Sequence, residues 1–152
     1  MLDFFMDNFY TSNDLLNTPL RDLEFTVLDF ETTGLYPFNG DRIVEFGMVR
    51  TNSARILKTF TSLINPRRAI PEAVSKINHI TDEMVKDSPF IETKIDQVVD
   101  FMKNSVVVAQ NLNFDISFLN YQLQSMGKPK IDLWMVDTLK VAKVLLPHLE
   151  RF

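Results

Sequence analysis

Residues 25–34 constrain the fold of this chain more than any other stretch. Residues 25–28 (Phe-Thr-Val-Leu) are aromatic, β-branched or apolar, which is typical of a buried β-strand. Asp29 and Glu31 follow two residues apart, so on a strand both side chains point to the same face. Residues 32–34 (Thr-Thr-Gly) then predict a tight turn in which a ligand can approach the backbone closely.

Two carboxylates side by side at the end of an apolar strand repel each other, unless a cation neutralises them. Neither neighbouring residue is basic, which favours a divalent metal ion as the cation. A pair of solvated acids at a strand end is the simpler alternative for an isolated D-x-E pattern. Other features of the sequence must decide between a metal-binding pair and a pair of solvated acids.

Length and composition describe an ordinary globular domain. The 152 residues, 45% of them hydrophobic and 24% charged, suffice for one domain with a core. With no cysteine there are no disulfides or thiolate zinc sites. No apolar run reaches the roughly 18 residues of a transmembrane helix. Residues 1–10 contain no Lys or Arg, unlike a secretory signal. We therefore expect a cytoplasmic protein with no membrane partner.

The net charge of −4 argues against a protein that holds nucleic acid by bulk attraction. Residues 1–20 contain three Asp and no basic residue, so the remaining 132 residues carry a net charge of about −1. A nearly neutral body with local basic spots suits a protein that grips a few phosphates. The loop residues that would contact phosphates are Arg67, Arg68, Lys128 and Lys130, although solvated loop charges are the simpler interpretation.

The hydrophobic pattern predicts three strands, followed by helices and strands in alternation. Strands are expected at residues 25–28, 42–50, 55–64, 106–109 and 133–136. Helices are expected at residues 71–77, 92–103, 116–126 and 138–146, with Thr81 and Thr138 as caps. In the second strand, Ile43 is expected on the face opposite to Val44 and Phe46.

The spacing of these elements predicts the fold class. Short connections between the first three strands favour an antiparallel meander. The later alternation favours parallel strands joined by right-handed crossovers. We therefore expect an α/β fold with a mixed five-stranded sheet and flanking helices.

Residues 1–20 form an extension ahead of the domain, which is expected at residues 21–152. Apolar residues recur there at the spacing of a short amphipathic helix, namely Leu2, Phe5, Met6 and Phe9. Such a helix either packs on its own domain or docks on a partner.

A third carboxylate follows another predicted strand. Residues 111–115 (Asn-Leu-Asn-Phe-Asp) come directly after residues 106–109, which places Asp115 in the first turn of the next helix. That position lies near the carboxyl end of a sheet strand, where open α/β sheets usually bind ligands. An isolated acid there usually complements the helix dipole. Three carboxylates together are the oxygen ligands that one or two Mg²⁺ or Mn²⁺ ions require.

Four motifs, in this order, resemble the DEDD (DnaQ-like) 3′–5′ exonucleases, a family with a ribonuclease H-like fold. The motifs are D-x-E-T-T-G at 29–34, a segment similar to I-x-G-I-T-x-E-M-V at 77–85, N-x-x-F-D-x-x-F-L at 111–119 and D-T-L at 137–139. The resemblance covers residues 22–152. Within the family, the chain is most similar to the proofreading exonucleases of bacterial DNA polymerase III, which are either the epsilon subunit or a domain within the polymerase.

The resemblance implies a metal-dependent 3′–5′ exonuclease that releases nucleoside monophosphates. It makes Asp29, Glu31 and Asp115 the catalytic residues and the ligands of two Mg²⁺ or Mn²⁺ ions. The substrate contacts that it implies are Thr32, Thr33, Gly34, Leu35, Asn78, Asn111, Phe114 and Phe118. It also implies a single-stranded DNA 3′ end as the substrate and a DNA polymerase subunit as a partner, with RNA 3′ trimming as an alternative.

Members of the family carry a further motif, His-x4-Asp, in a C-terminal helix. This motif has no counterpart in the sequence. His148 follows the D-T-L segment too closely, and Phe152 stands four residues after it in place of an acid. His79 occupies the position of a family glycine and is expected to be a surface or loop histidine. The chain thus resembles an exonuclease domain without its last helical part, and we expect weak metal binding and little or no activity from it alone. A shortened, non-catalytic relative that binds nucleic acid or a partner is the alternative.

Overall fold

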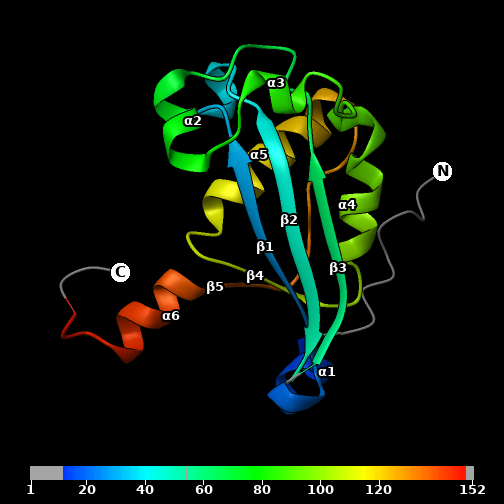
Figure 1. Ribbon diagram of the computed structural model, residues 1–152. Coiled ribbons are helices and arrows are strands. Elements are labelled where there is room, and N and C mark those ends of the chain that lie inside the picture. The colour runs from blue at the N-terminus through cyan, green and yellow to red at the C-terminus, as the bar shows by residue number, and fades with distance from the viewer. Residues whose placement is uncertain (1–11, 54, 150–152) are drawn as a thin grey trace.

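A five-stranded mixed sheet, in the order β3-β2-β1-β4-β5, forms the centre of the computed structural model (Figure 1). The structure describes residues 12–53 and 55–149. Strand β1 is antiparallel to β2, and β2 to β3, whereas β4 is parallel to β1 and β5 to β4. The predicted meander followed by parallel strands is confirmed. The strands are β1 Glu24–Thr32, β2 Ile43–Asn52, β3 Arg55–Leu63, β4 Val106–Ala109 and β5 Met135–Asp137.

Helices flank this sheet as predicted. In Figure 1, α5 lies behind the strands and α4 lies beside β3, α2 and α3 lie near one end of β1 and β2, and α6 extends to the side beyond β5. The described helices are α1 Ser12–Asn17, α2 Glu72–Asn78, α3 Asp82–Val85, α4 Ile95–Met102, α5 Asn113–Ser125 and α6 Thr138–Leu145, with short 3-10 turns η1 Leu20–Asp22, η2 Pro37–Asn39 and η3 Ile91–Thr93. None of these helices is both long and apolar enough to span a membrane.

The main core lies between the sheet and the helices α4 and α5. Leu28 and Phe30 of β1 are 2% and 3% exposed, and they belong to one buried cluster with residues of both helices. The contributors from α4 are Ile95, Val98, Val99, Phe101 and Met102, and those from α5 are Phe118, Leu119 and Leu123. The helical spacing of apolar residues in these segments therefore marks the faces that cover the sheet.

A β-bulge near the start of β2 changes the predicted faces of that strand. The pairing of β1 with β2 skips Val44, because Glu31 pairs with Glu45 but Thr32 pairs with Ile43. As a result, Ile43 joins the main core, and Val44 packs in a smaller cluster of its own with Ile70, Ile80 and Val85. The expectation that Ile43 faces away from the core residues of this strand was wrong.

Several predicted boundaries also shifted. Strand β1 continues to Thr32 instead of ending near residue 28, because β2 pairs with it along its whole length. The cap of α6 is Asp137, whose carboxylate accepts from the backbone N–H of Leu139 at 3.0 Å, whereas the Thr138 hydroxyl donates to the carbonyl of Ala109. Thr81 caps α3 as predicted.

The N-terminal extension is only partly described. Helix α1 and turn η1 lie within it. The amphipathic helix predicted from Leu2 to Phe9 lies outside the described residues.

Candidate active site

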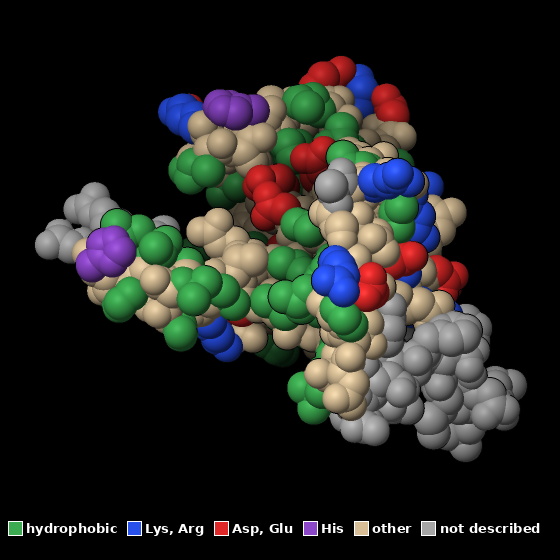
Figure 2. Space-filling view, turned by 90° about the horizontal axis from the view of Figure 1, so that it is seen from below, with side chains coloured by type: hydrophobic (Ala, Val, Ile, Leu, Met, Phe, Trp, Pro, Cys, Tyr) green, Lys and Arg blue, Asp and Glu red, His purple; other side chains and the backbone are tan. Residues whose placement is uncertain are grey.

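The acidic pair of the first motif lies on the open face of β1. Asp29 is exposed and Glu31 is partly buried, while their neighbours Leu28 and Phe30 point into the core on the other face. The predicted shared face of the two acids is therefore confirmed. A hollow of about 400 Å³ on this face includes both acids together with residues of β2 and β3. Figure 2 shows acidic side chains in and around a hollow of the surface, beside hydrophobic ones.

Glu31 lies in an environment that disfavours its charge. Burial raises the pKa of the Glu31 carboxyl above its usual value, and the charge of Asp29 raises it further. A hydrogen bond with Asn78 lowers this pKa in part, and the charge of Glu45 on the neighbouring strand β2 raises it again. Because Glu31 and Glu45 are directly paired across the two strands, their carboxylates repel each other.

Asp115 reaches the acidic pair from the first turn of α5. Strand β4 pairs with β1 only up to Val27, and beyond that point α5 approaches the edge of β1. There the backbone N–H of Phe30 donates to Oδ1 of Asp115 at 3.0 Å. Phe30 stands between Asp29 and Glu31 in the sequence, so this bond brings the third carboxylate next to the first two.

Burial raises the pKa of Asp115 to about 7. The side chain is only 3% exposed, so its charged form has lost most of its contact with water. The hydrogen bond from Phe30 lowers the pKa, and the charges of Asp29 and Glu31 raise it. The three carboxylates are therefore coupled electrostatically, which is the situation that a bound cation relieves.

The donor chemistry of these three side chains suits Mg²⁺ or Mn²⁺, which prefer carboxylate oxygens. Asp29 and Glu31 point into an open hollow, and Asp115 is buried and repelled by both. Residues 12–53 and 55–149 nevertheless contain no group of three acidic, His or Cys side chains arranged to hold one ion together. The residue types therefore fit a divalent ion, and side-chain adjustment is needed to bring the oxygens together around it.

The turn after the acidic pair is organised by Asp41. The Thr33 hydroxyl contacts one oxygen of the Asp41 carboxylate at 3.4 Å, and the backbone N–H of Tyr36 donates to the other at 3.0 Å. A Cβ atom on Gly34 would lie 2.4 Å from this carboxylate, so a larger residue at position 34 requires the Asp41 side chain to move. The side chain that approaches the Gly34 backbone is therefore Asp41 of the same chain.

The two threonines of the motif are buried and bonded within the turn. The Thr32 hydroxyl donates to the carbonyl of Gly34 at 2.5 Å, and Thr33 accepts from the backbone N–H of Arg42 at 3.0 Å. By contrast, Leu35 is 65% exposed beside the exposed rings of Tyr36 and Phe38. Among the predicted contacts in this turn, Leu35 is thus the side chain most accessible to a ligand.

Asn78, at the end of α2, hydrogen-bonds residues 31 and 32 of the D-x-E-T-T-G motif. Its side-chain amide donates to the carbonyl of Thr32 at 3.5 Å and also hydrogen-bonds the Glu31 carboxylate. Its Oδ1 accepts from the backbone N–H of Ile80. Asn78 therefore positions Glu31, whereas the neighbouring His79 is exposed and ends α2 in the left-handed conformation with φ 61°.

The predicted substrate contacts of the motif at 111–119 support the start of α5. Asn111 has φ 55°, and its backbone N–H donates to the carboxylate of Asp137 at 3.1 Å. Phe118 is 2% exposed in the main core, and the partly buried Phe114 stacks beside it at 5.1 Å between ring centroids. A direct contact of these three side chains with substrate stays a prediction.

Two acids near the site were missed by the sequence analysis. Glu45 faces Glu31 across the pairing of β1 with β2. An acid on the strand predicted to follow β1 was the sequence feature that could have indicated this contact. Asp41 fills the space above Gly34, and a loop aspartate of this kind carries no local signal of that contact. His148 is exposed beyond the end of α6, as expected of a tail residue.

A family model described as "Exonuclease" (RNase_T) matches residues 26–151, which include all three carboxylates and most of the described sheet. The chain belongs to this exonuclease family. The resemblance inferred from the four sequence motifs is thereby confirmed, and so is the ribonuclease H-like sheet that it implied.

Similar curated proteins include two kinds of bacterial DNA polymerase III protein. DNA polymerase III subunit epsilon of Treponema pallidum is 43% identical over 127 residues, which are 84% of this chain and 59% of that protein. A PolC-type DNA polymerase III of Caldanaerobacter subterraneus subsp. tengcongensis is 36% identical over 85% of this chain and 9% of that protein. The chain thus spans between about a tenth and three fifths of the length of these relatives.

Two solved structures share the fold. Exonuclease X, in complex with 5′ overhanging duplex DNA, superposes with a TM-score of 0.66 and 27% identity over 84% of this chain and 68% of that chain. Exonuclease I superposes with a TM-score of 0.72 over 85% of this chain and 32% of that chain. At 17% identity, Exonuclease I supports the fold alone.

Proposed function

We propose that this chain carries most of the active site of a metal-dependent 3′–5′ exonuclease that releases nucleoside monophosphates from DNA. The observation that carries the proposal is the convergence of Asp115 on the pair Asp29 and Glu31, through its bond to the backbone between them. Membership of the exonuclease family supports the same reaction.

Members of this family generally depend on divalent metal ions. In the proposed site, Asp29, Glu31 and Asp115 would hold Mg²⁺ or Mn²⁺. Two such ions would supply activation of the attacking water and stabilisation of the leaving 3′ oxygen. The protein's part is to keep Asp115 next to β1, to orient Glu31 through Asn78, and to present the exposed Leu35 to the terminal base.

The substrate and partner are proposed from the relatives. Their names, DNA polymerase III subunit epsilon and PolC-type DNA polymerase III, support proofreading of a DNA 3′ end in association with a polymerase. The substrate proposed for the hollow that contains Asp29 and Glu31 is a single-stranded 3′ end. This function would place the protein in the cytoplasm.

The lack of a His-x4-Asp motif in these 152 residues limits the proposed activity. That motif would supply a fourth acid and a general base for the attacking water. We therefore expect weak metal binding and little hydrolysis by this chain alone.

The test is the effect of Mn²⁺ on the melting temperature of the full 152-residue chain. Binding at ten times the dissociation constant adds about 1.4 kcal/mol to the free energy of unfolding. We expect Asp115→Asn to abolish the rise in melting temperature, and Asp87→Asn, which changes an exposed acid after α3, to leave it intact.

Either of two results would overturn the proposal. One is the absence of any Mn²⁺ effect, which would favour the non-catalytic, partner-binding alternative. The other is an Mn²⁺ effect that persists in Asp115→Asn. A parallel assay on 5′-labelled single-stranded DNA and RNA measures hydrolysis, and rapid trimming that is lost in Asp29→Asn would contradict only the expected weakness of this chain.

A further inference from the structure

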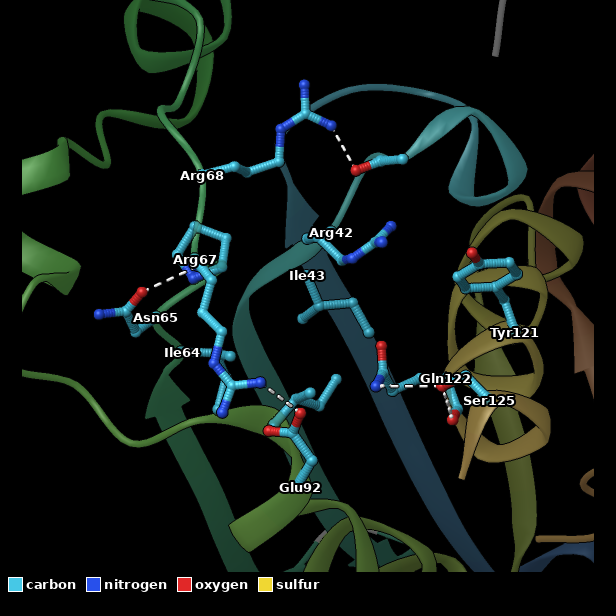
Figure 3. Close-up of a pocket in the computed structure, with 13 residues that line it drawn as sticks. Arg42, Ile43, Ile64, Asn65, Arg67, Arg68, Glu92, Tyr121, Gln122 and Ser125 are labelled. Carbon is cyan, nitrogen blue, oxygen red and sulfur yellow. Dashed lines mark hydrogen bonds and ion pairs between the residues drawn. The ribbon is translucent and has the colours of Figure 1, made fainter. Parts of the chain in front are cut away.

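A second cavity, of about 540 Å³, lies between the loop that follows β3 and the helix α5 (Figure 3). It shares no lining residue with the hollow that contains Asp29 and Glu31. Three arginines and one glutamate line it, which gives a formal charge of +2 in a chain whose net charge is −4. The cavity is therefore a local basic site on an acidic protein, separate from the carboxylates.

The three arginines keep donors available for a ligand. Arg67 pairs with Glu92 at 2.6 Å, and Arg68 pairs with Asp41 at 3.3 Å. Arg42 donates to the carbonyl of Asp41 and, among the described residues, pairs with no carboxylate. A guanidinium has five N–H donors, so each of these groups is held in place by one or two acceptors and retains others.

The guanidinium groups do not converge on one point. In Figure 3, Arg68 points to one end of the cavity, Arg67 points to the opposite end, and Arg42 points toward the ring of Tyr121 on α5. The Arg42 guanidinium lies 5.5 Å from the centroid of that ring. A single phosphate is best bound by donors that converge on it, whereas spaced donors suit an anion with several charges in a row.

The cavity adjoins two segments that also support the candidate active site, namely the loop at Asp41 and the helix α5. Arg42 directly follows Asp41, which fills the motif turn at Gly34. Tyr121 follows Asp115 by six residues on α5, which is about 9 Å along the helix axis. Ile43 and Ile64 of the cavity wall belong to the main core, so the cavity lies on the helix-covered side of the sheet, whereas the hollow with Asp29 and Glu31 lies on the open face.

We propose that this cavity binds the phosphodiester backbone of a nucleic-acid strand, at nucleotides away from the reacting 3′ end. The proposal rests on the proposed function only for the position of the strand relative to the 3′ end. The binding itself requires no metal ion and no hydrolysis.

The test measures the binding of a fluorescent single-stranded oligodeoxynucleotide to the full chain in the presence of a chelator, over a series of salt concentrations. For single strands, each lost phosphate contact reduces the slope of log K against log salt by about 0.7. We expect the double variant Arg42→Gln/Arg67→Gln to reduce the slope by about 1.4. Arg55→Gln, an exposed arginine at the far end of β3, is the control with the same charge change per site and should leave the slope unchanged.

A second pair of variants leaves every arginine contact in place. Ser125→Glu adds a carboxylate to the cavity wall, and Gln124→Glu adds one to the adjacent exposed position of α5, which does not line the cavity. We expect Ser125→Glu to weaken binding on the order of fivefold, and Gln124→Glu to change it little. Melting temperatures confirm that each variant is folded.

The proposal is overturned if the double arginine variant keeps the full salt slope, or if Ser125→Glu and Gln124→Glu have the same effect. It is also overturned if dAMP raises the melting temperature through Arg42 while the oligonucleotide slope is unchanged, since the cavity would then be a mononucleotide site. Because no metal is present, failure of the exonuclease assay leaves this result unaffected. Conversely, an unchanged slope leaves the proposed hydrolysis intact.

Discussion

The two faces of strand β1 have opposite roles, although they alternate residue by residue. On the covered face, Thr26, Leu28 and Phe30 are 0–3% exposed and pack under α4 and α5. On the open face, Val27 is 43% exposed and Asp29 is exposed beside the partly buried Glu31. The strand thus contributes burial on one side and negative charge on the other.

The difference shows how the fold supports mutually repelling acids. Burial of apolar surface stabilises the fold by about 25 cal/mol per Å². The side chains on the covered face of β1 contribute this stabilisation. The open face contributes little burial, and its carboxylates destabilise one another. Substitutions on the covered face, at the acids and at the end of β1 should therefore differ in the size and sign of their effects on stability.

Leu28→Ala should have the largest effect on stability. Leu28 is 2% exposed within the main core, and truncation of a buried leucine costs about 2–5 kcal/mol through lost burial and the cavity left behind. Val27→Ala, one residue away on the open face, should cost less than about 1 kcal/mol. Urea denaturation of both variants measures the difference. Equal losses at the two positions would show that the open face is covered in solution.

Asp115 should make the protein less stable as the pH rises from about 4 to 7. Its folded pKa is about 7, against an ordinary value of 3.8, so in this window the folded state binds more protons than the unfolded state. The free energy of unfolding therefore falls with pH, by on the order of 2–4 kcal/mol for this one group. Asp115→Asn removes this contribution, and the two proteins are compared by denaturation across this pH range. Parallel pH curves would refute the assignment.

Gly34→Ala should cost about 1–3 kcal/mol, the usual range for an overpacked site. Gly34 lies just beyond the end of β1, and a Cβ there would lie 2.4 Å from the carboxylate of Asp41. If this contact is the cause, the cost of Gly34→Ala should be smaller in an Asp41→Ala background. A double-mutant cycle by thermal denaturation measures this. An unchanged cost in that background would mean that the backbone, and not Asp41, limits the position.

Local patterns predicted much of the fold. The strand β4 was predicted to the residue, because a short apolar run with polar flanks is a local signal. The end of β1 was missed, because Asp29 and Glu31 resemble a strand end until β2 pairs with them. The bulge at Val44 was missed for the same reason, since it arises from the pairing of two strands.

The candidate site also combines features that have a local sequence signal with features that depend on distant parts of the chain. The shared face of Asp29 and Glu31 follows from the two-residue period of a strand and needs no partner. The approach of Asp115 to Phe30 links residues 85 apart in the sequence. Its position after a second buried strand, together with the resemblance to a family, suggested that Asp115 joins the acidic pair, but neither predicted the hydrogen bond to Phe30. The contact of Asp41 with Gly34 depends on how the loop folds back, for which the sequence has no periodic signal.

Glu45→Gln should have the smallest effect, and its sign should be opposite to that of Leu28→Ala and Gly34→Ala. Glu45 pairs with Glu31 on the open face, and its charge raises the pKa of Glu31. Removal of this charge at pH 7 relieves a repulsion that solvent partly screens, so we expect the free energy of unfolding to rise by a few tenths of a kcal/mol.

Thr59→Ser, a small change on β3 at the edge of the same hollow, controls for altered strand packing. A stabilising change at Glu45 that fades in high salt would identify electrostatic repulsion as its cause, because salt screens exposed charges. A loss of stability on Glu45→Gln would instead mean that this carboxylate makes favourable contacts, and the open face could then no longer be described as destabilised by its acids.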